Sequence, residues 1–477
     1  MSNNTLKVKR EDLRESLNLL KGVQAKGKNL TNNNFVNISA FQSDKDIIKL
    51  SASHPSFSLM DVEVTLPCKD YSISEEVAIA TVPADITNSV KFIKQEDQEP
   101  TIYLDESSVK INNSMFFNNI YNSETSLYLP LKTSYMQNIT PEGFNINISL
   151  SRTKLLDVLT RTKCAMAGKS EVRDCLKGVY FEVKGDGYLT IVTADGRRMA
   201  RENMQYSGNY NEKINNILIP SDVINFLMKL MKNKYYNGDC PYVYISFSLG
   251  EEEKKDENGV TEKCSEFHLG RITMGDVTVY FKGISNKFPN YQQVTPTGGS
   301  RSLLLNREEF IKSLELLEFS LKSTDDDEPV CYQLYLSDYN KNKEWQNVFL
   351  LGLGMTTKEY EEWCGRREEK VVSTASKVIK IGSGYYDGGK SPCDDNQFFK
   401  GYCVDQVGFS IKYTLDILKS LKDERIIFRF FENNLGPQII ERDNNNDDTF
   451  LYICMPIRLK ERKVDPEEEI TKLGRSY

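Results

Sequence analysis

Hydrophobic and polar positions along this chain follow one arrangement that occurs three times. Each copy begins with a short strand-like stretch, passes through a charged opening, and continues with apolar residues spaced three or four positions apart. The copies are LKVKREDLRESLNLLKGV (6–23), INISLSRTKLLDVLTRTKCAMAG (146–168) and LLLNREEFIKSLELLEFSLKS (303–323). Because apolar residues at this spacing share one face of an α-helix, each copy predicts a strand followed by an amphipathic helix.

A second amphipathic helix is predicted later in each copy. The segments are TVPADITNSVKFIK (81–94), LIPSDVINFLMKLMKNK (218–234) and GFSIKYTLDILKSLKD (408–423). Pro83 and Pro220 lie at or near the first helical position, where the missing N–H of proline costs nothing. Short β-rich stretches bounded by turn residues lie between the helices, so each copy predicts strand, helix, antiparallel strands, second helix and further strands.

This pattern predicts an α+β fold of three repeated domains, each with two helices packed on antiparallel sheets. The expected boundaries are 1–143, 144–298 and 299–477. The interval between the two helices is longest in the third copy, which predicts an insertion within 336–400. A length of 477 residues is too great for one ordinary hydrophobic core and suits several domains.

The charge distribution separates the predicted helices from the rest of the chain. The chain has a net charge of -7, yet the helical parts 9–21, 83–94, 151–169, 219–234, 306–322 and 410–422 together hold 20 Lys and Arg against 11 Asp and Glu. Cationic helices in an acidic protein suggest a common anionic partner such as duplex DNA, contacted through its backbone. The plainer alternative is that each lysine row is a solvated helix face.

The sequence shows few signs of a catalytic, metal or cofactor site. The chain has no phosphate-binding GxxxxGK[ST] loop, no HExxH, no GxSxG, no CxxC among its ten cysteines, and only two histidines. We therefore expect no cofactor, no metal and no catalysis, and reduced thiols in a cytoplasm. No apolar stretch approaches the ~20 residues that cross a membrane, and the N-terminus has no secretory apolar region.

Four stretches, in the same order, resemble one known family. They are AMAGKSEVRDCLKGVYFEVKGDGYLTIVTADGRRMA (165–200), GISNKFPNYQQVTP (283–296), GFSIKYTLDILKSL (408–421) and YICMPIRL (452–459). Together they are similar to the bacterial-type DNA polymerase III beta subunit, the beta sliding clamp family. The family normally ends at the closing Arg-Leu, whereas this chain continues through a charged tail at 460–477.

The resemblance implies three clamp-like domains per chain and a head-to-tail dimer ring that encircles duplex DNA. Such a ring is a non-catalytic processivity factor in DNA replication. It would dock a replicative DNA polymerase, the clamp loader and repair proteins through short peptide motifs. The expected location is the cytoplasm, on DNA in a nucleoid or a viral replication compartment.

Candidate DNA-binding residues come from the helical segments and from the resemblance. The helical segments supply Lys91, Lys94, Lys154, Arg161, Lys169, Lys229, Lys232, Lys412 and Lys419. The resemblance adds Lys28 and Arg173, although Asp174 and Cys175 replace aromatic residues common in the family. For ring closure it implies Leu127, Leu129 and Phe319.

The resemblance also implies a partner-peptide pocket between the second and third domains. Its matching positions are Leu176, Ala194, Gly196, Arg197, Arg198, Met199, Pro289, Val294, Ser410, Tyr413, Leu435, Pro437, Ile453, Cys454, Met455, Pro456, Ile457, Arg458 and Leu459. Aliphatic and Met side chains give an adaptable apolar surface, and Arg198 or Arg458 could fix polar groups of a peptide. Arg197 stands where the family usually has His, Ala194 where Thr is common, and Gln293 where a basic residue is common, so the preferred peptide could differ.

Two other classes of function stay open at this point. One is a carboxylate-dependent DNA-processing enzyme that uses the acidic runs at 325–327 or 447–448, although acidic runs are usually solvated turns. The other is an interaction scaffold that never touches nucleic acid. Retention on circular but not on linear DNA separates a clamp from both.

Overall fold

The computed structural model describes the stretches that carry the repeated pattern and several of their connections. The described residues are 4–23, 35–54, 60–73, 77–83, 86–89, 98–104, 108–112, 115–118, 144–236, 240–255, 261–297, 300–321, 331–336, 345–353, 376–387, 407–431, 436–443 and 450–458.

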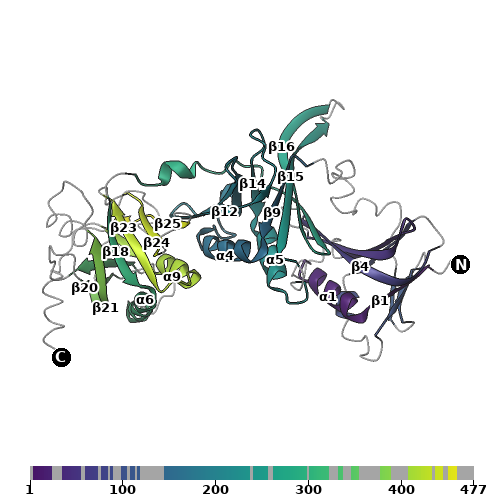
Figure 1. Ribbon diagram of the computed structural model, residues 1–477, viewed down its shortest axis with the longest axis horizontal. Coiled ribbons are helices and arrows are strands. Elements are labelled where there is room, and N and C mark those ends of the chain that lie inside the picture. The colour runs from purple at the N-terminus through teal and green to yellow at the C-terminus, as the bar shows by residue number, and fades with distance from the viewer. Residues whose placement is uncertain are drawn as a thin grey trace. The chain divides into compact units, whose positions relative to one another are not determined.

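The chain forms two compact units, each built from three separate parts of the sequence (Figure 1). The first unit comprises Met1–Asp157, Lys177–Thr190 and Met204–Lys287. The second comprises Val158–Leu176, Ile191–Asn203 and Phe288–Tyr477.

Most elements belong entirely to one unit. Elements of the first unit are β1 (Asn4–Val8), α1 (Arg10–Lys21), β2 (Phe35–Phe41), β3 (Asp44–His54), β4 (Met60–Ser72), β5 (Val77–Pro83), α2 (Ile86–Ser89), β6 (Thr101–Leu104), β7 (Ser108–Ile111), β8 (Met115–Asn118), β9 (Ile146–Ser151), β10 (Gly178–Val183), β13 (Ser207–Gly208), β14 (Asn216–Pro220), α5 (Ser221–Lys232), β15 (Tyr242–Lys255), β16 (Thr261–Met274) and β17 (Val277–Lys282). Those of the second are the 3-10 turns η4 (Lys163–Ala165), η5 (Asp174–Leu176) and η6 (Tyr291–Val294), and β18 (Ser300–Asn306), α6 (Arg307–Leu321), β19 (Cys331–Leu336), β20 (Trp345–Leu353), β21 (Ser376–Asp387), β22 (Val407–Ser410), α9 (Ile411–Ser420), β23 (Arg425–Phe431), β24 (Gln438–Arg442), β25 (Phe450–Cys454) and β26 (Ile457–Arg458). The sequence runs from one unit into the other within α4 (Arg152–Thr162), β11 (Tyr188–Ala194) and β12 (Arg198–Gln205).

The predicted strand–helix openings are confirmed in all three copies, as β1–α1, β9–α4 and β18–α6. Two second helices are also confirmed, as α5 and α9, and each begins where its sequence provides a suitable first residue. Pro220 occupies the N-cap of α5, and the Ser410 hydroxyl caps α9 by accepting a hydrogen bond from the Tyr413 amide at 3.3 Å. Of the helix expected within 83–94, the structure describes only α2, and residues 90–97 lie outside the described residues.

The first unit contains one continuous antiparallel sheet in the order β13-β9-β15-β16-β17-β4-β1-β6-β7-β8, with β3 also paired to β4, β2 to β3 and β5 to β2. Within it β17 pairs with β4, and Val277 lies opposite Val64. The hairpin between β16 and β17 turns at Gly275, whose φ of 56° suits glycine. This sheet therefore runs across the domain boundary expected near 143.

The second unit contains the strand order β12-β25-β24-β23-β18-β21-β20-β19-β22-β26. Here β12, from the expected second domain, pairs with β25 from the third, and Met199 lies opposite Ile453. The compact units therefore do not follow the boundaries 1–143, 144–298 and 299–477, and division into three domains stays a prediction. Within 336–400, where the sequence predicts an insertion, the structure describes the sheet strands β20 and β21, and the insertion stays a prediction.

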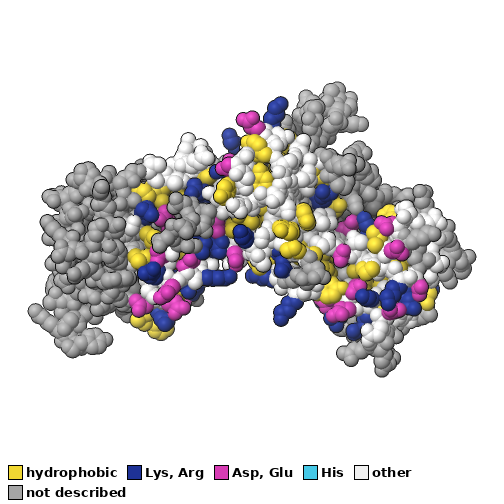
Figure 2. All heavy atoms as spheres, in the orientation of Figure 1, with side chains coloured by type: hydrophobic (Ala, Val, Ile, Leu, Met, Phe, Trp, Pro, Cys, Tyr) yellow, Lys and Arg dark blue, Asp and Glu magenta, His cyan; other side chains and the backbone are white. Residues whose placement is uncertain are grey.

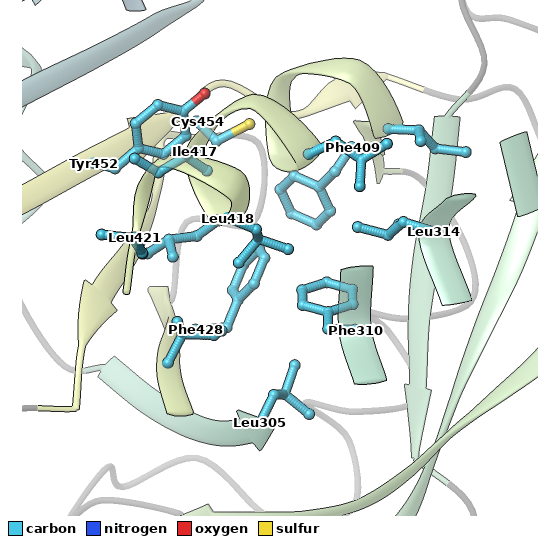
Figure 3. Packing of buried hydrophobic residues seen from close by; sticks show 14 of the residues in the cluster. Leu305, Phe310, Leu314, Phe409, Ile417, Leu418, Leu421, Phe428, Tyr452 and Cys454 are labelled. Atoms are coloured by element: carbon cyan, nitrogen blue, oxygen red, sulfur yellow. The ribbon is translucent and has the colours of Figure 1, made fainter. Parts of the chain in front are cut away.

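The core of the second unit lies between its helices and its sheet (Figure 3). Phe310 from α6 and Leu418 from α9 are fully buried with Phe428 from β23. The Phe428 ring lies 5.2 Å from the Phe409 ring and 4.7 Å from the Phe430 ring, between ring centroids. Such aromatic packing couples both helices to the strands that carry the candidate site.

Replacing Phe428 by Ala should destabilise the second unit by about 3–5 kcal/mol, because it removes a fully buried ring and leaves a cavity. Both tryptophans, Trp345 and Trp363, fall in the sequence range Phe288–Tyr477 of this unit, so the midpoint of urea unfolding is followed by tryptophan fluorescence. Val172→Ala, at a side chain that is 89% exposed, is the control and should change stability by less than about 0.5 kcal/mol. Equal effects of the two substitutions would contradict this description of the core.

Candidate functional site

A tight turn at residues 195–198 stands at the centre of the candidate partner site. The Asp195 carboxylate accepts hydrogen bonds from the amides of Arg197 at 2.9 Å and Arg198 at 3.0 Å. Between them Gly196 adopts a φ of 88°, a conformation that favours glycine. The Met455 amide donates to the Arg197 carbonyl at 2.9 Å, which ties the end of β25 to this turn.

The Arg198 side chain lies almost entirely buried between two carboxylates. Its Nε donates to Asp195 Oδ2 and its Nη1 to Asp416 Oδ2, each at 2.8 Å. The guanidinium carbon lies 4.1 Å from the centre of the Tyr413 ring, a distance typical of a cation–π contact. Arg198 therefore joins the turn to α9, and much of its hydrogen-bonding capacity is already used.

Electrostatics around Arg198 keep the arginine charged and the neighbouring thiol neutral. Burial opposes the charged form of Arg198, yet its pKa is raised, because Tyr452, Asp416 and Asp195 favour the guanidinium charge. Burial also raises the pKa of the Cys454 thiol to about 12. A neutral, buried thiol is a poor nucleophile, so Cys454 behaves as a small apolar residue.

All described residues of the predicted peptide pocket belong to the second unit. Buried ones are Leu176, Met199, Ile453 and Cys454; partly buried ones are Ala194, Arg198, Ser410, Tyr413, Pro437, Pro456 and Ile457; exposed ones are Gly196, Arg197, Pro289, Val294 and Met455. Leu435 and Leu459 lie outside the described residues, as does the side chain of Arg458. The hydrogen bonds and ring contacts given above connect a smaller group: Arg197, Arg198, Tyr413 and Met455.

Sequence reasoning missed the two carboxylates that hold Arg198. Asp195 lies within the same TADGRR stretch, so its spacing from Arg198 could have suggested a turn. Asp416 is 218 positions away from Arg198, and nothing in the local sequence points to that pairing. Because these carboxylates occupy Arg198, it has less hydrogen-bonding capacity left for a peptide. The exposed side chains here are those of Arg197 and Met455.

The predicted DNA-binding cations fall into three groups. Lys154, Lys169, Lys229, Lys232, Lys412 and Lys419 are exposed, and Lys28, Lys91 and Lys94 lie outside the described residues. Figure 2 shows Lys and Arg side chains interspersed with Asp and Glu on the visible face, rather than one unbroken basic patch. Lys419 illustrates this, since its Nζ lies 2.7 Å from the Glu315 carboxylate.

Two predicted DNA-binding arginines are engaged within the protein. The Arg161 guanidinium forms a two-point pair with the buried Glu202 carboxylate, at 2.8 Å and 2.5 Å. Arg173 is exposed and pairs with Glu171 at 2.8 Å. We therefore leave both out of the proposed DNA-binding set.

For ring closure, Phe319 on α6 is 81% exposed, and Leu127 and Leu129 lie outside the described residues. Among the described residues, no cluster of His, Cys, Asp and Glu could hold a metal ion. The acidic runs at 325–327 and 447–448 lie outside them. No described helix combines the length and apolarity that crossing a membrane requires.

Comparison with known proteins gives one consistent family. Residues 149–260 match the family described as "DNA polymerase III beta subunit, central domain". A beta sliding clamp of Pseudomonas aeruginosa is 24% identical over 315 residues, which is 66% of this chain and 66% of that relative's own length. A beta sliding clamp of Vibrio cholerae is 22% identical over 414 residues, covering 87% of this chain and 91% of the relative.

Solved structures extend the likeness over nearly the whole chain. The crystal structure of the DNA polymerase III subunit beta from Pseudomonas aeruginosa superposes with a TM-score of 0.64 at 19% identity. The superposition covers 95% of this chain and 100% of that chain. At this identity the likeness shows the shared fold.

Arg198→Met should destabilise the second unit by about 2–3 kcal/mol, because it leaves the Asp195 and Asp416 carboxylates without their cation. A fully buried pair loses about 3–5 kcal/mol on such a change, and Asp416 is partly exposed. Lys419→Met, which removes an exposed pair with Glu315, is the control and should cost about 0–1 kcal/mol. Tryptophan-detected urea unfolding measures both, and a loss at Arg198 no larger than at Lys419 would contradict the arrangement.

The stability of the second unit should fall as the pH rises from 9 towards 12. The Cys454 thiol loses its proton near pH 9 in the unfolded chain but only near 12 in the folded one, so alkaline pH favours unfolding. This thiol alone contributes a slope of up to about 1.4 kcal/mol per pH unit. Cys454→Ala should flatten the slope above pH 9 by about that amount and leave it unchanged between pH 7 and 8; identical slopes above pH 9 would refute the assignment.

Proposed function

We propose that this chain is a divergent member of the beta sliding clamp family and that it encircles duplex DNA as a ring. In this role it is a non-catalytic subunit that keeps a replicative DNA polymerase on its template. A closed ring holds DNA by topology, so its contacts with phosphate can be weak and salt-screened, which allows sliding.

The observation that carries this proposal is the recurrence of exposed lysines on helices of different copies of the repeat. Lys154 lies on α4, Lys229 and Lys232 on α5, and Lys412 on α9. None of these four forms an ion pair with another described residue, although the chain as a whole is acidic. Together with Lys169 they form the proposed phosphate-facing set, which carries no sequence specificity.

The second part of the proposal concerns partner proteins. The exposed side chains of Met455 and Val294 offer apolar contact, and the Met455 amide is hydrogen bonded to the carbonyl of the exposed Arg197. Methionine adapts its shape to different ligands, and arginine binds carboxylates and carbonyl groups. This surface suits short linear peptides that combine an apolar anchor with a polar group, as carried by a polymerase, a clamp loader or repair proteins.

The ring requires two protomers joined head to tail. The exposed Phe319 ring on α6 supports this assembly, because large apolar side chains at that level of exposure are typical of interaction surfaces. We place the assembly on DNA in the cytoplasm.

Wild-type protein should remain on a nicked circular plasmid during gel filtration at physiological salt and should dissociate once a restriction enzyme linearises the plasmid. The physical reason is that topological retention needs an unbroken circle. Equal retention on both forms, or sedimentation as a strict monomer at micromolar concentration, would count against the ring.

A second measurement separates phosphate contacts from topology. Replacing Lys229, Lys232 and Lys412 by Gln should reduce the slope of log K against log salt for linear duplex DNA by about 2–3, at roughly 0.9 per lost contact. Lys213→Gln, at an exposed lysine outside the proposed set, is the matched control and should leave the slope unchanged.

A further inference from the structure

The loop at residues 168–176 approaches the 195–198 turn closely. Its base is closed by the Ala167 amide, which donates to the Leu176 carbonyl at 3.2 Å, and by the Leu176 amide, which donates to the Arg173 carbonyl at 3.1 Å. Both segments belong to the second unit. Arg173 therefore projects from a loop whose backbone is itself held by hydrogen bonds.

Glu171 fixes the orientation of the Arg173 side chain. One carboxylate oxygen accepts from Arg173 Nε at 2.8 Å and from the Arg173 amide at 3.1 Å, and the other accepts from Nη2 at 3.4 Å. These contacts hold the pKa of the Glu171 carboxyl down at about 2. Glu171 therefore stays charged and paired over the whole physiological pH range.

The Arg173 guanidinium also contacts the turn. Its Nη2 makes a longer contact of 3.5 Å with the Asp195 carbonyl oxygen. A Cβ atom placed at Gly196 would lie only 2.6 Å from the same nitrogen. The turn accommodates Arg173 because its second residue has no side chain.

The 195–198 turn holds the residues of the candidate partner surface in place. Its Arg197 carbonyl accepts the Met455 amide, and its Asp195 side chain holds the Arg198 guanidinium at 2.8 Å. A displacement of the turn would therefore move Arg197, Arg198 and Met455 together.

We propose that Arg173, oriented by Glu171, is a positioning residue that holds the 195–198 turn in the geometry that partner peptides meet. It acts through Gly196 and the Asp195 carbonyl, and does not serve as a phosphate contact. The consequence for partners rests on the proposed function, whereas the positioning role concerns the folded chain alone.

Hydrogen exchange of the full chain tests this directly. The Met455 amide reports the link between the turn and β25, and the Arg197 and Arg198 amides report the turn itself. Both Glu171→Gln and Arg173→Gln should speed exchange at these amides about 2–5-fold, in keeping with the loss of one exposed ion pair. Unchanged exchange in both variants overturns the proposal.

DNA binding separates this role from a phosphate contact. If Arg173 positions the turn, neither variant changes the salt slope for linear duplex DNA, whereas Lys169→Gln in the same loop lowers it by about 0.9. If Arg173 binds phosphate, Arg173→Gln lowers the slope and Glu171→Gln strengthens DNA binding by freeing the arginine, and that result overturns the proposal.

A pair of glycine variants supplies a steric control. Gly196 and Gly187 both have φ near 90°, but an added Cβ meets Arg173 at Gly196 and no atom within 4 Å at Gly187. Gly196→Ala should therefore speed exchange of the Met455 amide well beyond the effect of Gly187→Ala. If the variants change amide exchange as predicted but the wild-type protein is not retained on circular DNA, the proposed function is wrong and the positioning role still holds.

Discussion

Five residue pairs between β12 and β25, from Arg198 opposite Cys454 to Glu202 opposite Phe450, join parts of the chain about 250 positions apart. The rest of the candidate site depends on this antiparallel pairing. It places the 195–198 turn at the end of β25, so that Met455 can hydrogen bond to Arg197. Backbone hydrogen bonds set this register, and a shift of one residue would reverse which side chains face the core.

The cations of this protein lie in two different environments, which burial distinguishes. Arg198 and Arg161 are largely removed from water and matched with carboxylates, Asp195 and Asp416 for the first and Glu202 for the second. A charge in such a place must be paired to be tolerated, so these arginines organise the fold. Exposed lysines such as Lys229 and Lys412 keep their hydration and remain available to a mobile polyanion.

Strand pairing also explains why the compact units differ from the repeats. A repeat defined by sequence ends where its pattern ends, but an edge strand still needs a hydrogen-bonding neighbour. In both units that neighbour comes from the next repeat, as with β4 and β17 or β12 and β25. The unit that folds compactly is therefore assembled from parts of successive repeats.

The sequence by itself determined the local elements and the resemblance to beta sliding clamps. Apolar spacing located α1, α4, α5, α6 and α9, because helical periodicity is a property of neighbouring residues. Tertiary structure alone decided which charges are paired. Nothing in the local sequence pairs Arg161 with Glu202, 41 positions away, or Arg198 with Asp416, 218 positions away. Ion pairs and strand registers join residues distant in sequence, and no local pattern encodes that distance.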